Sequence, residues 1–408
     1  MPNIGNLYGY SDTNAVIPVV YTTSTTLVSE MNLYDNTGTY INEKVGTILS
    51  SDSFELMPKY TLTINTTPSN ATVYLTINGQ TTQARTATIF PGTSVHWTAH
   101  ASNYDDLNGD ITPTQDTTLT ENLYSTNIPW STSAQRNSQA WHDITYNGSI
   151  YAVVSESSQI GITDDLSANT WNVVSAGLGG PKNYYWYGIA YGNNKFVVLD
   201  RKGWLSYSTD NCITWATKFR DSNLATVADS TTFNGHWYDI LWDGTRFVAL
   251  SYHGYLSTSS DGITWNTAIT PADLTSTSGY WVRLKWDGVR YIALAYDGFI
   301  GYSTNLTNWT VYKPSVFGTN SRWNALIVNS QTDYHKYVVF QSGTTGTVYT
   351  TTCTDITDPT SWTALQSYTG SSNSDTGLCH EWRDGIYTHN NKYAIVGDSG
   401  WVAVANAS

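Results

Sequence analysis

The segment Trp237-Tyr238-Asp239-Ile240-Leu241-Trp242, with the turn Asp243-Gly244 and the run Arg246-Phe247-Val248-Ala249-Leu250 behind it, decides the fold of this chain. Asp-Gly tolerates the positive φ angles of a two-residue hairpin, so the segment predicts two antiparallel strands joined by a tight turn. A second hairpin is expected between Tyr255 and Trp265. The whole phrase therefore predicts a four-stranded antiparallel unit.

Six copies of this phrase follow one another along the chain, and each opens on a tryptophan. The opening residues are Trp141, Trp186, Trp237, Trp281, Trp323 and Trp382, at spacings of 45, 51, 44, 42 and 59 residues. Propeller blades repeat every ~40 to 50 residues, and a single blade cannot bury both of its faces alone. We therefore expect an all-β protein with a six-bladed β-propeller.

The two ends of the repeat region predict how the ring closes. Five copies carry a closing tryptophan on the expected fourth strand, namely Trp171, Trp215, Trp265, Trp309 and Trp362. The sixth copy ends after Trp401-Val402-Ala403-Val404, but Ile128-Pro129-Trp130-Ser131-Thr132, ahead of the first copy, resembles residues 360–364. We expect residues 126–408 to form the propeller, with the Trp130 strand completing the last blade so that no strand edge stays open.

The turns before three closing tryptophans resemble a known structural motif. Residues 208–215 and 259–265 are similar to the Asp-box of sialidase-type propellers, and a third copy replaces Asp with Asn. The residues in the motif positions are Asp210, Trp215, Asp261, Gly262, Trp265, Asn305 and Trp309. The resemblance implies a structural role, because Asp accepts hydrogen bonds from turn amides, Gly permits a left-handed residue and Trp packs between blades.

Composition and charge exclude several classes of protein. Only 12% of the residues are charged, whereas the chain has 30 Tyr and 17 Trp, which suits a rigid extracellular or virion surface. The formal net charge of −13 and the 19 scattered Lys and Arg argue against nucleic-acid binding. Cys212, Cys353 and Cys379 lack metal-ligand spacing, so we expect free buried thiols, no disulfide framework and no metal site. We also expect neither a signal peptide nor a membrane span.

Two shorter regions precede the repeats. Residues 58–125 alternate in hydrophobicity around the turn Asn78-Gly79, and the phrases at 67–73, 78–79 and 91–93 are similar to PEGA-type and related immunoglobulin-like modules. That resemblance implies a spacer without catalytic residues. Residues 1–57, with possible strands at 16–21 and 26–34, match no family that we can name. We interpret them as a small β region that anchors the protein to other virion proteins, and a plain spacer is the alternative.

The residues of the propeller region predict a protein without catalytic activity. Sialidase-like hydrolases need three arginines, a Tyr activated by a Glu and an Asp acid/base. The Arg-Ile-Pro phrase that usually brings the first arginine is absent, and the propeller region has only two glutamates, Glu156 and Glu381. Arg246 and Arg290 occupy equivalent turn positions of two copies, which indicates a structural role. We expect no enzyme activity and no cofactor, and a sialidase-type glycoside hydrolase is an alternative.

Loops that join second to third strands and loops that join successive blades share one face of a propeller, so we predict ligand binding there. Aromatic rings beside charged groups suit sugars, whose CH faces stack on rings while their hydroxyls form hydrogen bonds. The candidates in the first kind of loop are Asp200, Arg201, Lys202, Tyr252, His253, Tyr296, Asp297 and Asp398. The candidates in the second kind are Tyr184, Tyr185, His236, Tyr280, His380 and Glu381.

The repeats, the Asp-box-like turns and the PEGA-like module together resemble tailed-bacteriophage structural proteins that are often described as sialidase-like. The resemblance implies a tail fibre, a capsid fibre or a receptor-binding protein that is made in the host cytoplasm and exposed on the virion in several copies, with a homo-oligomer as one arrangement. Host cell-surface carbohydrate is the expected ligand. Two alternatives stay open, a purely structural decoration protein and a secreted bacterial glycan-binding protein.

Overall fold

The computed structural model describes most of the chain from residue 59 onward and a few strands before it. The described residues are 7–10, 16–20, 33–34, 40–41, 55–56 and 59–406, except for 91, 103, 124–127, 129, 131–133, 136–138, 156, 158, 169–170, 176–184, 218, 229–235, 277–279, 319–321, 330–335, 343–344, 372–380 and 389–390. They divide into two compact units, Met1–Thr126 and Asn127–Ser408. Among these residues, no helix has the length and hydropathy of a membrane span.

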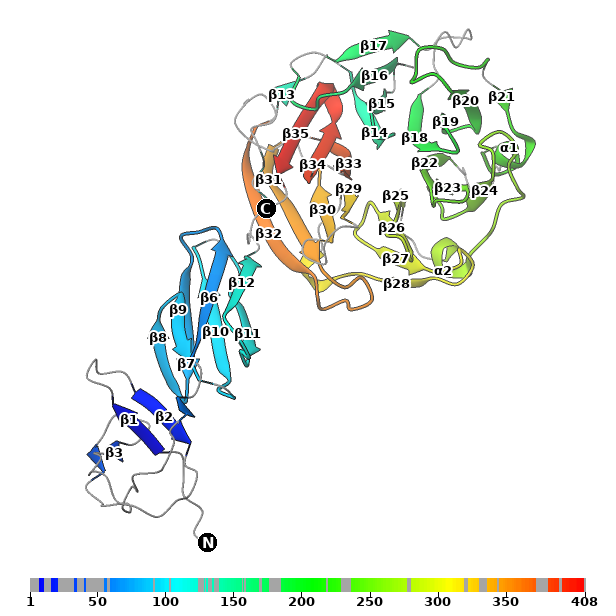
Figure 1. Ribbon diagram of the computed structural model, residues 1–408. Coiled ribbons are helices and arrows are strands. Elements are labelled where there is room, and N and C mark those ends of the chain that lie inside the picture. Colours follow the sequence, from blue (N-terminus) through cyan, green and yellow to red (C-terminus); the bar gives the residue numbers. More distant parts are fainter. Residues whose placement is uncertain are drawn as a thin grey trace. The chain divides into compact units, whose positions relative to one another are not determined.

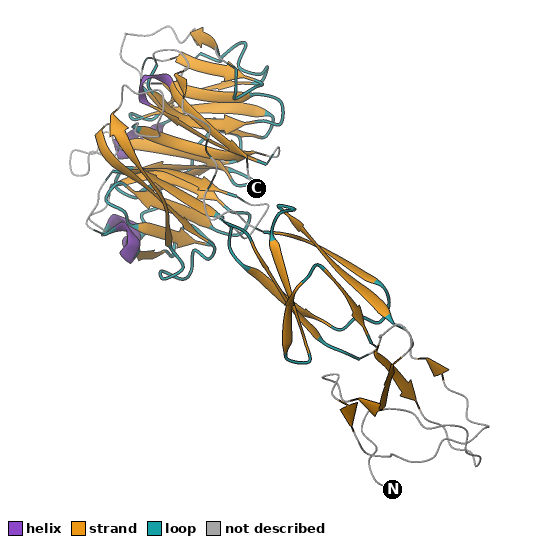
Figure 2. Cartoon of the chain, turned by 90° about the vertical axis from the view of Figure 1, so that its left-hand side faces the viewer, coloured by secondary structure: helices purple, strands orange, loops and turns teal. Residues whose placement is uncertain are grey.

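Strands dominate both units, and the described helices lie only in the second unit (Figure 2). The N-terminal strands form one five-stranded sheet in the order β4-β3-β1-β2-β5. These strands are β1 Leu7–Tyr10, β2 Val16–Val20, β3 Leu33–Tyr34, β4 Tyr40–Ile41 and β5 Glu55–Leu56. The strand expected at 16–21 corresponds to β2, whereas β3 covers only the last two residues of the strand expected at 26–34, and the rest of that segment lies outside the described residues.

The rest of the first unit is built from two sheets around one core. The sheets have the orders β11-β10-β7-β8 and β12-β6-β9. Their strands are β6 Tyr60–Thr67, β7 Thr72–Ile77, β8 Gln80–Gln83, β9 Thr86–Ile89, β10 Val95–His100, β11 Leu107–Ile111 and β12 Thr117–Asn122. Alternating residues such as Leu62, Ile64, Leu75 and Trp97 fill the core between them. Asn78 and Gly79 both have positive φ, as expected for the hairpin between β7 and β8.

The second unit consists of six sheets, which we number one to six in chain order. Sheet one contains β14 Trp141–Tyr146, β15 Tyr151–Ser155, β16 Gln159–Thr163 and β17 Asn172–Ser175. Sheet two contains β18 Trp186–Gly192, β19 Lys195–Asp200, β20 Trp204–Ser208 and β21 Phe219–Arg220. Sheet three contains β22 Trp237–Trp242, β23 Phe247–Ser251 and β24 Leu256–Ser259. Sheet four contains β25 Trp281–Trp286, β26 Tyr291–Ala295, β27 Ile300–Ser303 and β28 Thr310–Tyr312. Sheet five contains β29 Trp323–Val328, β30 Tyr337–Gln341, β31 Thr345–Cys353 and β32 Thr363–Ser371. Sheet six contains β33 Trp382–Thr388, β34 Lys392–Gly397, β35 Trp401–Asn406 and β13 Ala134–Gln135.

The six sheets are arranged around a common centre, with the first strand of each sheet innermost (Figure 1). Each innermost strand contacts the innermost strands of both neighbouring sheets, and β33 contacts β14, so the circle is complete. This arrangement is that of a β-propeller. All six opening tryptophans are 0% exposed, which explains why the repeat is so regular at this position.

The innermost strands share one irregularity. In each of them the register shifts after the opening tryptophan, so that the second residue has no partner and the third pairs one position out of the regular register. Such a bulge turns a side chain away from its regular direction. The six third-position residues are Asp143, Gly188, Asp239, Arg283, Ala325 and Asp384. Four of them are charged and buried, so the centre of the ring is polar.

We call Asp143, Asp239, Arg283, Lys285 and Asp384 the axial cluster. Asp143 accepts hydrogen bonds from its own strand at Ile144 N (2.7 Å) and from sheet two at Ile189 N (2.7 Å). Asp239 makes the same pair of bonds between sheets three and four, to Ile240 N (2.8 Å) and Leu284 N (2.6 Å). Each of these two carboxylates therefore joins neighbouring sheets.

Arg283 spans the centre of the ring from sheet four. Its guanidinium donates to the carbonyl oxygens of His142 in sheet one (2.9 Å) and Arg383 in sheet six (2.6 Å). Asp384 Oδ1 lies 3.2 Å from Arg283 Nε, and Asp384 Oδ2 lies 2.5 Å from Lys285 Nζ. Arg283 is only 2% exposed, so its side chain is enclosed at the centre of the ring.

The outermost strand of sheet six comes from the chain ahead of sheet one. Trp130 forms an antiparallel bridge with Ala405, and β13 pairs with β35 through Ala134–Val402 and Gln135–Trp401. The Trp130 ring packs edge-on against Phe340, with ring centroids 5.1 Å apart. The two ends of the propeller sequence are therefore held together by strand pairing.

Two sequence expectations differ from the structure. Sheet three has three described strands, because its fourth segment pairs with β24 only through the bridge between Ile269 and Leu256, and Pro271 two residues later has no N–H to continue a ladder. In the other sheets the closing tryptophan lies ahead of the fourth strand and not on it. Trp309, for example, immediately precedes β28. The closing tryptophans Trp171, Trp265, Trp309 and Trp362 are nevertheless buried.

Short helices occupy segments between the sheets. They are α1 Ser222–Ala228, α2 Ala272–Thr275 and the 3-10 turns η1 Ser315–Phe317 and η2 Asp398–Gly400. Leu224 of α1 and Leu274 of α2 are fully buried, and their backbone carbonyls accept the indole N–H of Trp237 and Trp281. Cys212 and Cys353 are free and buried, as expected, and burial raises the pKa of the Cys212 thiol to about 12; Cys379 lies outside the described residues.

Candidate functional site

The turns after the second strands of sheets two, three and four share one backbone geometry. Each ends on a glycine with positive φ (Gly203, Gly254 and Gly298) whose N–H donates to the carbonyl three residues earlier. The tip residues of these turns are Arg201, Tyr252 and Tyr296. Their carbonyl oxygens accept the N–H of the opening tryptophan of the next sheet at 2.9 to 3.1 Å. The tip side chains are therefore fixed at the junctions between sheets.

The two kinds of loop that the sequence placed on one face do meet. Tyr252 N donates to His236 O (2.7 Å), Tyr296 N donates to Tyr280 O (2.7 Å), and Asp398 N donates to Glu381 O (3.0 Å). In each case the tip of a turn binds the residue that precedes the opening tryptophan of the same sheet. The loops therefore form one surface around the start of the innermost strands.

Aromatic rings form a continuous line that leads from the interior to this surface, which we call the aromatic band. The band consists of His142, Tyr187, Tyr238, Tyr252 and Tyr280. Successive ring centroids lie 4.5, 5.0, 5.1 and 4.6 Å apart, and the last pair is stacked with 12° between the ring planes. Tyr280 is 43% exposed at the end of the line, Tyr238 and Tyr252 are half-buried, and His142 and Tyr187 are only 2% exposed, so the band reaches solvent at its Tyr280 end.

Arg201 places a positive charge on the band. Its guanidinium carbon lies 4.1 Å from the ring centroid of Tyr187 and 5.1 Å from that of Tyr238, and Nη2 donates to the Tyr238 hydroxyl at 2.9 Å. Such contacts are favourable because the ring faces carry negative partial charge. The neighbouring Lys202 is exposed, so this end of the band is cationic.

His236, His253 and Tyr252 of this face are neutral near pH 7. Burial lowers the pKa of His253, and burial together with the charge of Arg201 lowers the pKa of His236. Burial and the neighbouring tyrosines raise the pKa of Tyr252 to about 12, so its hydroxyl keeps its proton. His253 also packs at right angles to Tyr252, with centroids 5.4 Å apart. The face thus offers neutral donors and acceptors beside the rings.

Sheet six contributes an ion cluster at the same level. Arg383 donates to both carboxylate oxygens of Asp398, at 2.8 and 2.7 Å, and to Glu381 Oε2 at 3.3 Å. The hydrogen bond with Asp398 and burial raise the pKa of Glu381, whereas hydrogen bonds from Arg383 outweigh burial and lower the pKa of Asp398. Both candidate carboxylates are therefore bound to a neighbouring arginine.

The other predicted site residues lie in different environments. Asp200 is 3% exposed and accepts hydrogen bonds from the N–H groups of Lys202 (2.7 Å) and Trp204 (2.8 Å). It therefore shapes the turn. Our prediction that Asp200 faces a ligand was wrong. Asp297 is half-buried, and its Oδ1 accepts no hydrogen bond from the described residues. Tyr185, next to the opening tryptophan of sheet two, is 44% exposed. Tyr184 and His380 lie outside the described residues.

The Asp-box-like turns act as structural elements. Asp210 Oδ1 accepts Thr214 N, Asp261 Oδ1 accepts Thr264 N, and Asn305 Oδ1 accepts Asn308 N, all within 2.9 Å. Gly262 adopts φ +71°, where a side chain would be strained. Trp265 and Trp309 are nearly fully buried, and Trp215 is half-buried. These hydrogen bonds and packing contacts explain the motif residues, so no ligand is needed to explain them.

Arg246 and Arg290 also have structural roles. Arg246 Nε lies 3.0 Å from Asp243 Oδ2, and Arg290 forms the equivalent pair with Asp287 at 3.7 Å. The hydroxyl groups of Tyr291 and Tyr337 donate to the same two carboxylates from the next sheets, both at 2.5 Å. The repeated turn arginines therefore lie in equivalent contacts between sheets.

Sequence reasoning missed three residues of the band. His142, Tyr187 and Tyr238 each follow an opening tryptophan within a strand; His142 and Tyr187 are packed there, at 2% exposed, and Tyr238 is half-buried. The residues at the position in chain order are His142, Tyr187, Tyr238, Val282, Asn324 and Arg383. The change of residue type at a position next to an invariant one was the signal that could have identified it.

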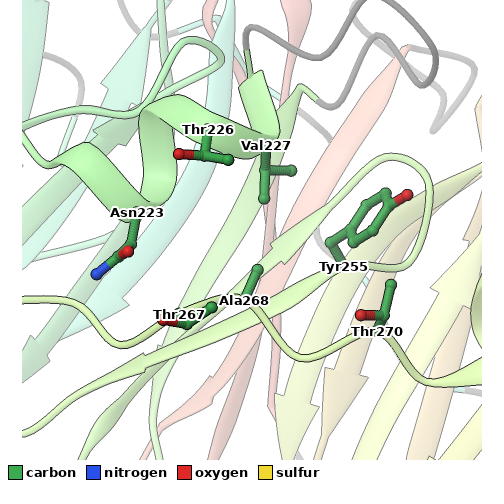
Figure 3. Close-up of a pocket in the computed structure, with 7 residues that line it drawn as sticks. All are labelled: Asn223, Thr226, Val227, Tyr255, Thr267, Ala268 and Thr270. Carbon is green, nitrogen blue, oxygen red and sulfur yellow. The ribbon is translucent and has the colours of Figure 1, made fainter.

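A separate hollow of about 270 Å³ lies at the outer edge of sheet three (Figure 3). It is lined by Asn223, Thr226, Val227, Tyr255, Thr267, Ala268 and Thr270. Asn223 Nδ2 donates to Trp265 O at 2.7 Å, which fixes α1 against this segment. None of the lining side chains carries a charge, so the hollow offers no acid and base pair and no metal ligand set.

Comparisons with known proteins give only weak similarity. No protein-family model matches the sequence, and no curated protein matches it. Among solved structures, YCF48 from Cyanidioschyzon merolae is 14% identical, with a TM-score of 0.46, over 68% of this chain and 99% of that chain. A structure of YCF48 bound to D1 peptide is 12% identical, with a TM-score of 0.43, over 69% and 98%. The WD40 β-propeller domain of Doa1 is 11% identical, with a TM-score of 0.45, over 69% and 98%.

These similarities carry no conclusion about a ligand, because every TM-score is below 0.5. They also do not bear on the resemblance to Asp-box sialidases, PEGA modules or bacteriophage proteins. Those resemblances stay predictions.

Proposed function

We propose that this chain is a non-catalytic binding protein whose six-bladed propeller recognises cell-surface carbohydrate through the aromatic band and its neighbours. The observation that carries the proposal is the line of rings from His142 to the exposed Tyr280, with Arg201 lying over two of them. The rings come from four different sheets, so the band exists only in the assembled propeller.

The chemistry of the band suits a sugar. Aromatic faces stack on the apolar CH faces of a pyranose, and stacking on a ring that is already held in place costs little conformational entropy. Tyr280 is held by its stacking on Tyr252. The guanidinium of Arg201, the ammonium of Lys202 and the imidazole of His253 supply hydrogen-bond donors, and the two cations favour acidic sugars.

Three of the four candidate carboxylates of this face argue against hydrolysis. A glycosidase needs one carboxyl group that can donate a proton and a second that is free to act as base or nucleophile. Asp200 is buried within its turn, and Glu381 and Asp398 are both bound to Arg383. Tyr252 keeps its proton, because its pKa is raised to about 12, so it does not act as a nucleophile at neutral pH.

We further propose that the protein is a bacteriophage structural protein, present in several copies on the virion and attached through residues 1–57. The order of a small β region, a β module and a propeller supports this setting, as does the low charge density of a chain rich in Tyr and Trp. Several weak sites on one particle would bind a cell surface by avidity. A purely structural decoration protein and a secreted bacterial glycan-binding protein are the competing functions.

A glycan array probed with the full-length protein tests carbohydrate binding. We expect binding to a subset of acidic glycans, lost in the Tyr280→Ala and Arg201→Ala variants. Ile213→Ala is the matched control, because Ile213 is an exposed apolar residue (75%) in an Asp-box-like turn and not in the band. Absence of binding to every glycan and host-surface preparation would favour the decoration function, and release of free sugar from a sialoside would refute a non-catalytic protein.

A separate experiment tests the anchor. Deletion of residues 1–57 should abolish incorporation into particles while the soluble protein keeps the glycan binding of the full chain. Incorporation of the deleted protein at normal levels would contradict the role of these residues without touching the carbohydrate proposal.

A further inference from the structure

The face opposite the aromatic band has its own ring of aromatic side chains. Tyr191, Trp242, Trp286 and Tyr387 stand at the far ends of four innermost strands, whereas the band begins near the start of the same strands. Each packs against an aromatic residue at the start of the second strand. The partners are Phe196, Phe247, Tyr291 and Tyr393, with ring centroids 4.8, 4.7, 4.5 and 5.0 Å apart. The four rings are therefore held in place before any ligand arrives.

These rings line a cavity of about 200 Å³ on the axis of the propeller, which we call the axial mouth. All four rings are half-buried, so part of each is open to the cavity or to solvent. Asp143 and Lys285 of the axial cluster also line it. Arg283 of the axial cluster is bonded to the carbonyls of His142 and Arg383. The axial mouth is therefore a cavity with aromatic side chains and two charged residues in its lining.

The charges beneath the axial mouth are unequal. The axial cluster holds the carboxylates Asp143, Asp239 and Asp384 against the bases Arg283 and Lys285, which gives 2 − 3 = −1 when all five are ionised. The exposed fraction of the Lys285 side chain is only 18%, and its ammonium is paired with Asp384. Asp384 Oδ1 lies near Arg283, and Asp384 is also hydrogen-bonded to Asp143, which helps to raise the pKa of Asp143. The excess negative charge is therefore present when all three carboxylates are ionised.

We propose that the axial mouth binds a small organic cation, such as a quaternary or alkylated ammonium group. Aromatic faces attract a cation through their negative quadrupole, and a partly enclosed site strengthens this attraction. When all three carboxylates are ionised, their excess negative charge acts in the same direction. Pockets for drug-sized ligands have volumes of ~300 to 1,000 Å³, so this smaller cavity fits one head group and not an extended molecule. The site lies apart from the aromatic band and does not depend on the proposed function.

A bound cation is also expected to change the protonation of the cluster. Burial and the neighbouring carboxylates raise the pKa of Asp143, and burial raises the pKa of Asp239 to about 6, against the opposing charges of Lys285 and Arg283. A cation favours the ionised carboxylates, so its binding should release protons near pH 6. Asp384, paired with both bases, faces the same cluster and belongs to the same equilibrium.

Titration calorimetry of the full-length protein with choline tests the site. The neutral isostere 3,3-dimethylbutan-1-ol has the same shape without the charge, and we expect it to bind about tenfold or more weakly than choline. At pH 6 the choline titration should release protons, seen as a dependence of the observed heat on the ionisation enthalpy of the buffer. Equal affinity for choline and the isostere, no choline binding up to millimolar concentration, or preferential binding of acetate would each overturn the proposal.

Variants locate the binding to the axial mouth. Trp286→Leu keeps an apolar side chain without a π system and should weaken choline binding about five- to tenfold, whereas Trp286→Phe should retain most of the affinity. Tyr280→Leu, on the opposite face, is the control and should leave choline binding unchanged. Full choline affinity in Trp286→Leu would contradict the site. If a variant fails to fold, the comparison of choline with its isostere on the unmodified protein still tests the proposal.

Discussion

The phenol ring of Tyr252 lies nearly parallel to that of Tyr280, with 4.6 Å between the centroids and 12° between the planes, although Tyr252 follows β23 of sheet three and Tyr280 precedes β25 of sheet four. Tyr252 also stacks on Tyr238 on its other side. Tyr252 therefore connects sheet three to the loop that enters sheet four, and Tyr280 is the exposed end of the stack.

This relationship predicts that the two tyrosines contribute differently to stability. Tyr280→Ala should lower the free energy of unfolding by about 1 kcal/mol or less, because the ring is 43% exposed and makes one stacking contact. Tyr252→Ala should cost about 2 kcal/mol, because it removes stacking on both sides. Urea unfolding of both variants checks the difference. Equal costs would mean that the stack does not connect the sheets, and a small cost makes Tyr280→Ala the cleaner probe of ligand binding.

The Asp200→Asn variant should become more stable than the unmodified protein as pH rises. Burial raises the pKa of Asp200 to about 6, so between pH ~4 and ~6 the folded protein keeps a proton that the unfolded chain releases. Stability contributed by this residue is therefore lost as pH rises through that window. Both backbone N–H groups bind the same oxygen, Oδ1, which Asn retains. The gain at pH 7 should reach at most about 3 kcal/mol.

Urea unfolding at pH 4, 5, 6 and 7 measures this gain, which must grow with pH. Asp243→Asn is the control of opposite sign. Hydrogen bonds from Tyr291, Thr245 and Arg246 outweigh burial and hold the pKa of Asp243 at about 2, so its carboxylate contributes stability that is present above pH ~4 and lost below it. Its replacement should cost more at pH 6 than at pH 3. A gain for Asp200→Asn that is the same at every pH would contradict the assignment.

Gly254→Ala should be far more destabilising than Gly244→Ala, although both glycines have positive φ, +84° and +96°. A Cβ on Gly254 would meet Leu274 Cβ at 2.7 Å and the Leu274 carbonyl carbon at 2.9 Å, whereas a Cβ on Gly244 meets nothing within 4 Å. The backbone penalty alone is about 1 kcal/mol, and the clash with α2 should bring Gly254→Ala above about 3 kcal/mol. Thermal and urea unfolding compare the pair, and similar losses would show that α2 yields to the new methyl group.

The regular part of the fold could be predicted from the sequence because it repeats. Each of the six opening tryptophans lies in an equivalent, fully buried position, and the geometry of turns such as Asp243-Gly244 follows from the two turn residues themselves. The helices could not be predicted, because α1 and α2 have seven and four residues and are stabilised by packing of Leu224 and Leu274.

The candidate site could be predicted in part. The sequence identified Tyr252 and Tyr280 because they lie in loops that vary between the repeats. Tyr187 and Tyr238 were not selected, because they lie within predicted strands. The axial cluster was missed for a different reason. A charged residue at the third strand position faces either side of a regular sheet, and only the bulge turns it to the axis. The contact from Arg283 to His142 O joins residues 141 positions apart, which local patterns do not encode.

Arg283→Met should be among the most destabilising substitutions in the chain. It removes the donors for the His142 and Arg383 carbonyls and leaves Asp384, which is 0% exposed, with Lys285 as its paired base. Removal of one partner from a buried ion pair costs about 3 to 5 kcal/mol. Arg246→Met is the control, because the Arg246 side chain is 43% exposed, and it should cost about 1 kcal/mol or less. Equal unfolding free energies of the two variants would contradict a structural role for the axial cluster.

Strand pairing between the two ends of the propeller sequence makes residues 128–135 part of the second unit. A fragment of residues 127–408 should unfold cooperatively at the temperature of the second unit in the full chain, whereas a fragment of residues 137–408 should lose several kcal/mol, because it lacks β13 and the bridge between Trp130 and Ala405. Trp130→Ala in the full chain separates side-chain packing from pairing. It removes the contact with Phe340 and should cost about 2 to 3 kcal/mol, while the β13 pairing stays. Calorimetry of the three proteins measures these effects. A 137–408 fragment as stable as the 127–408 fragment would show that sheet six needs no strand from the preceding chain.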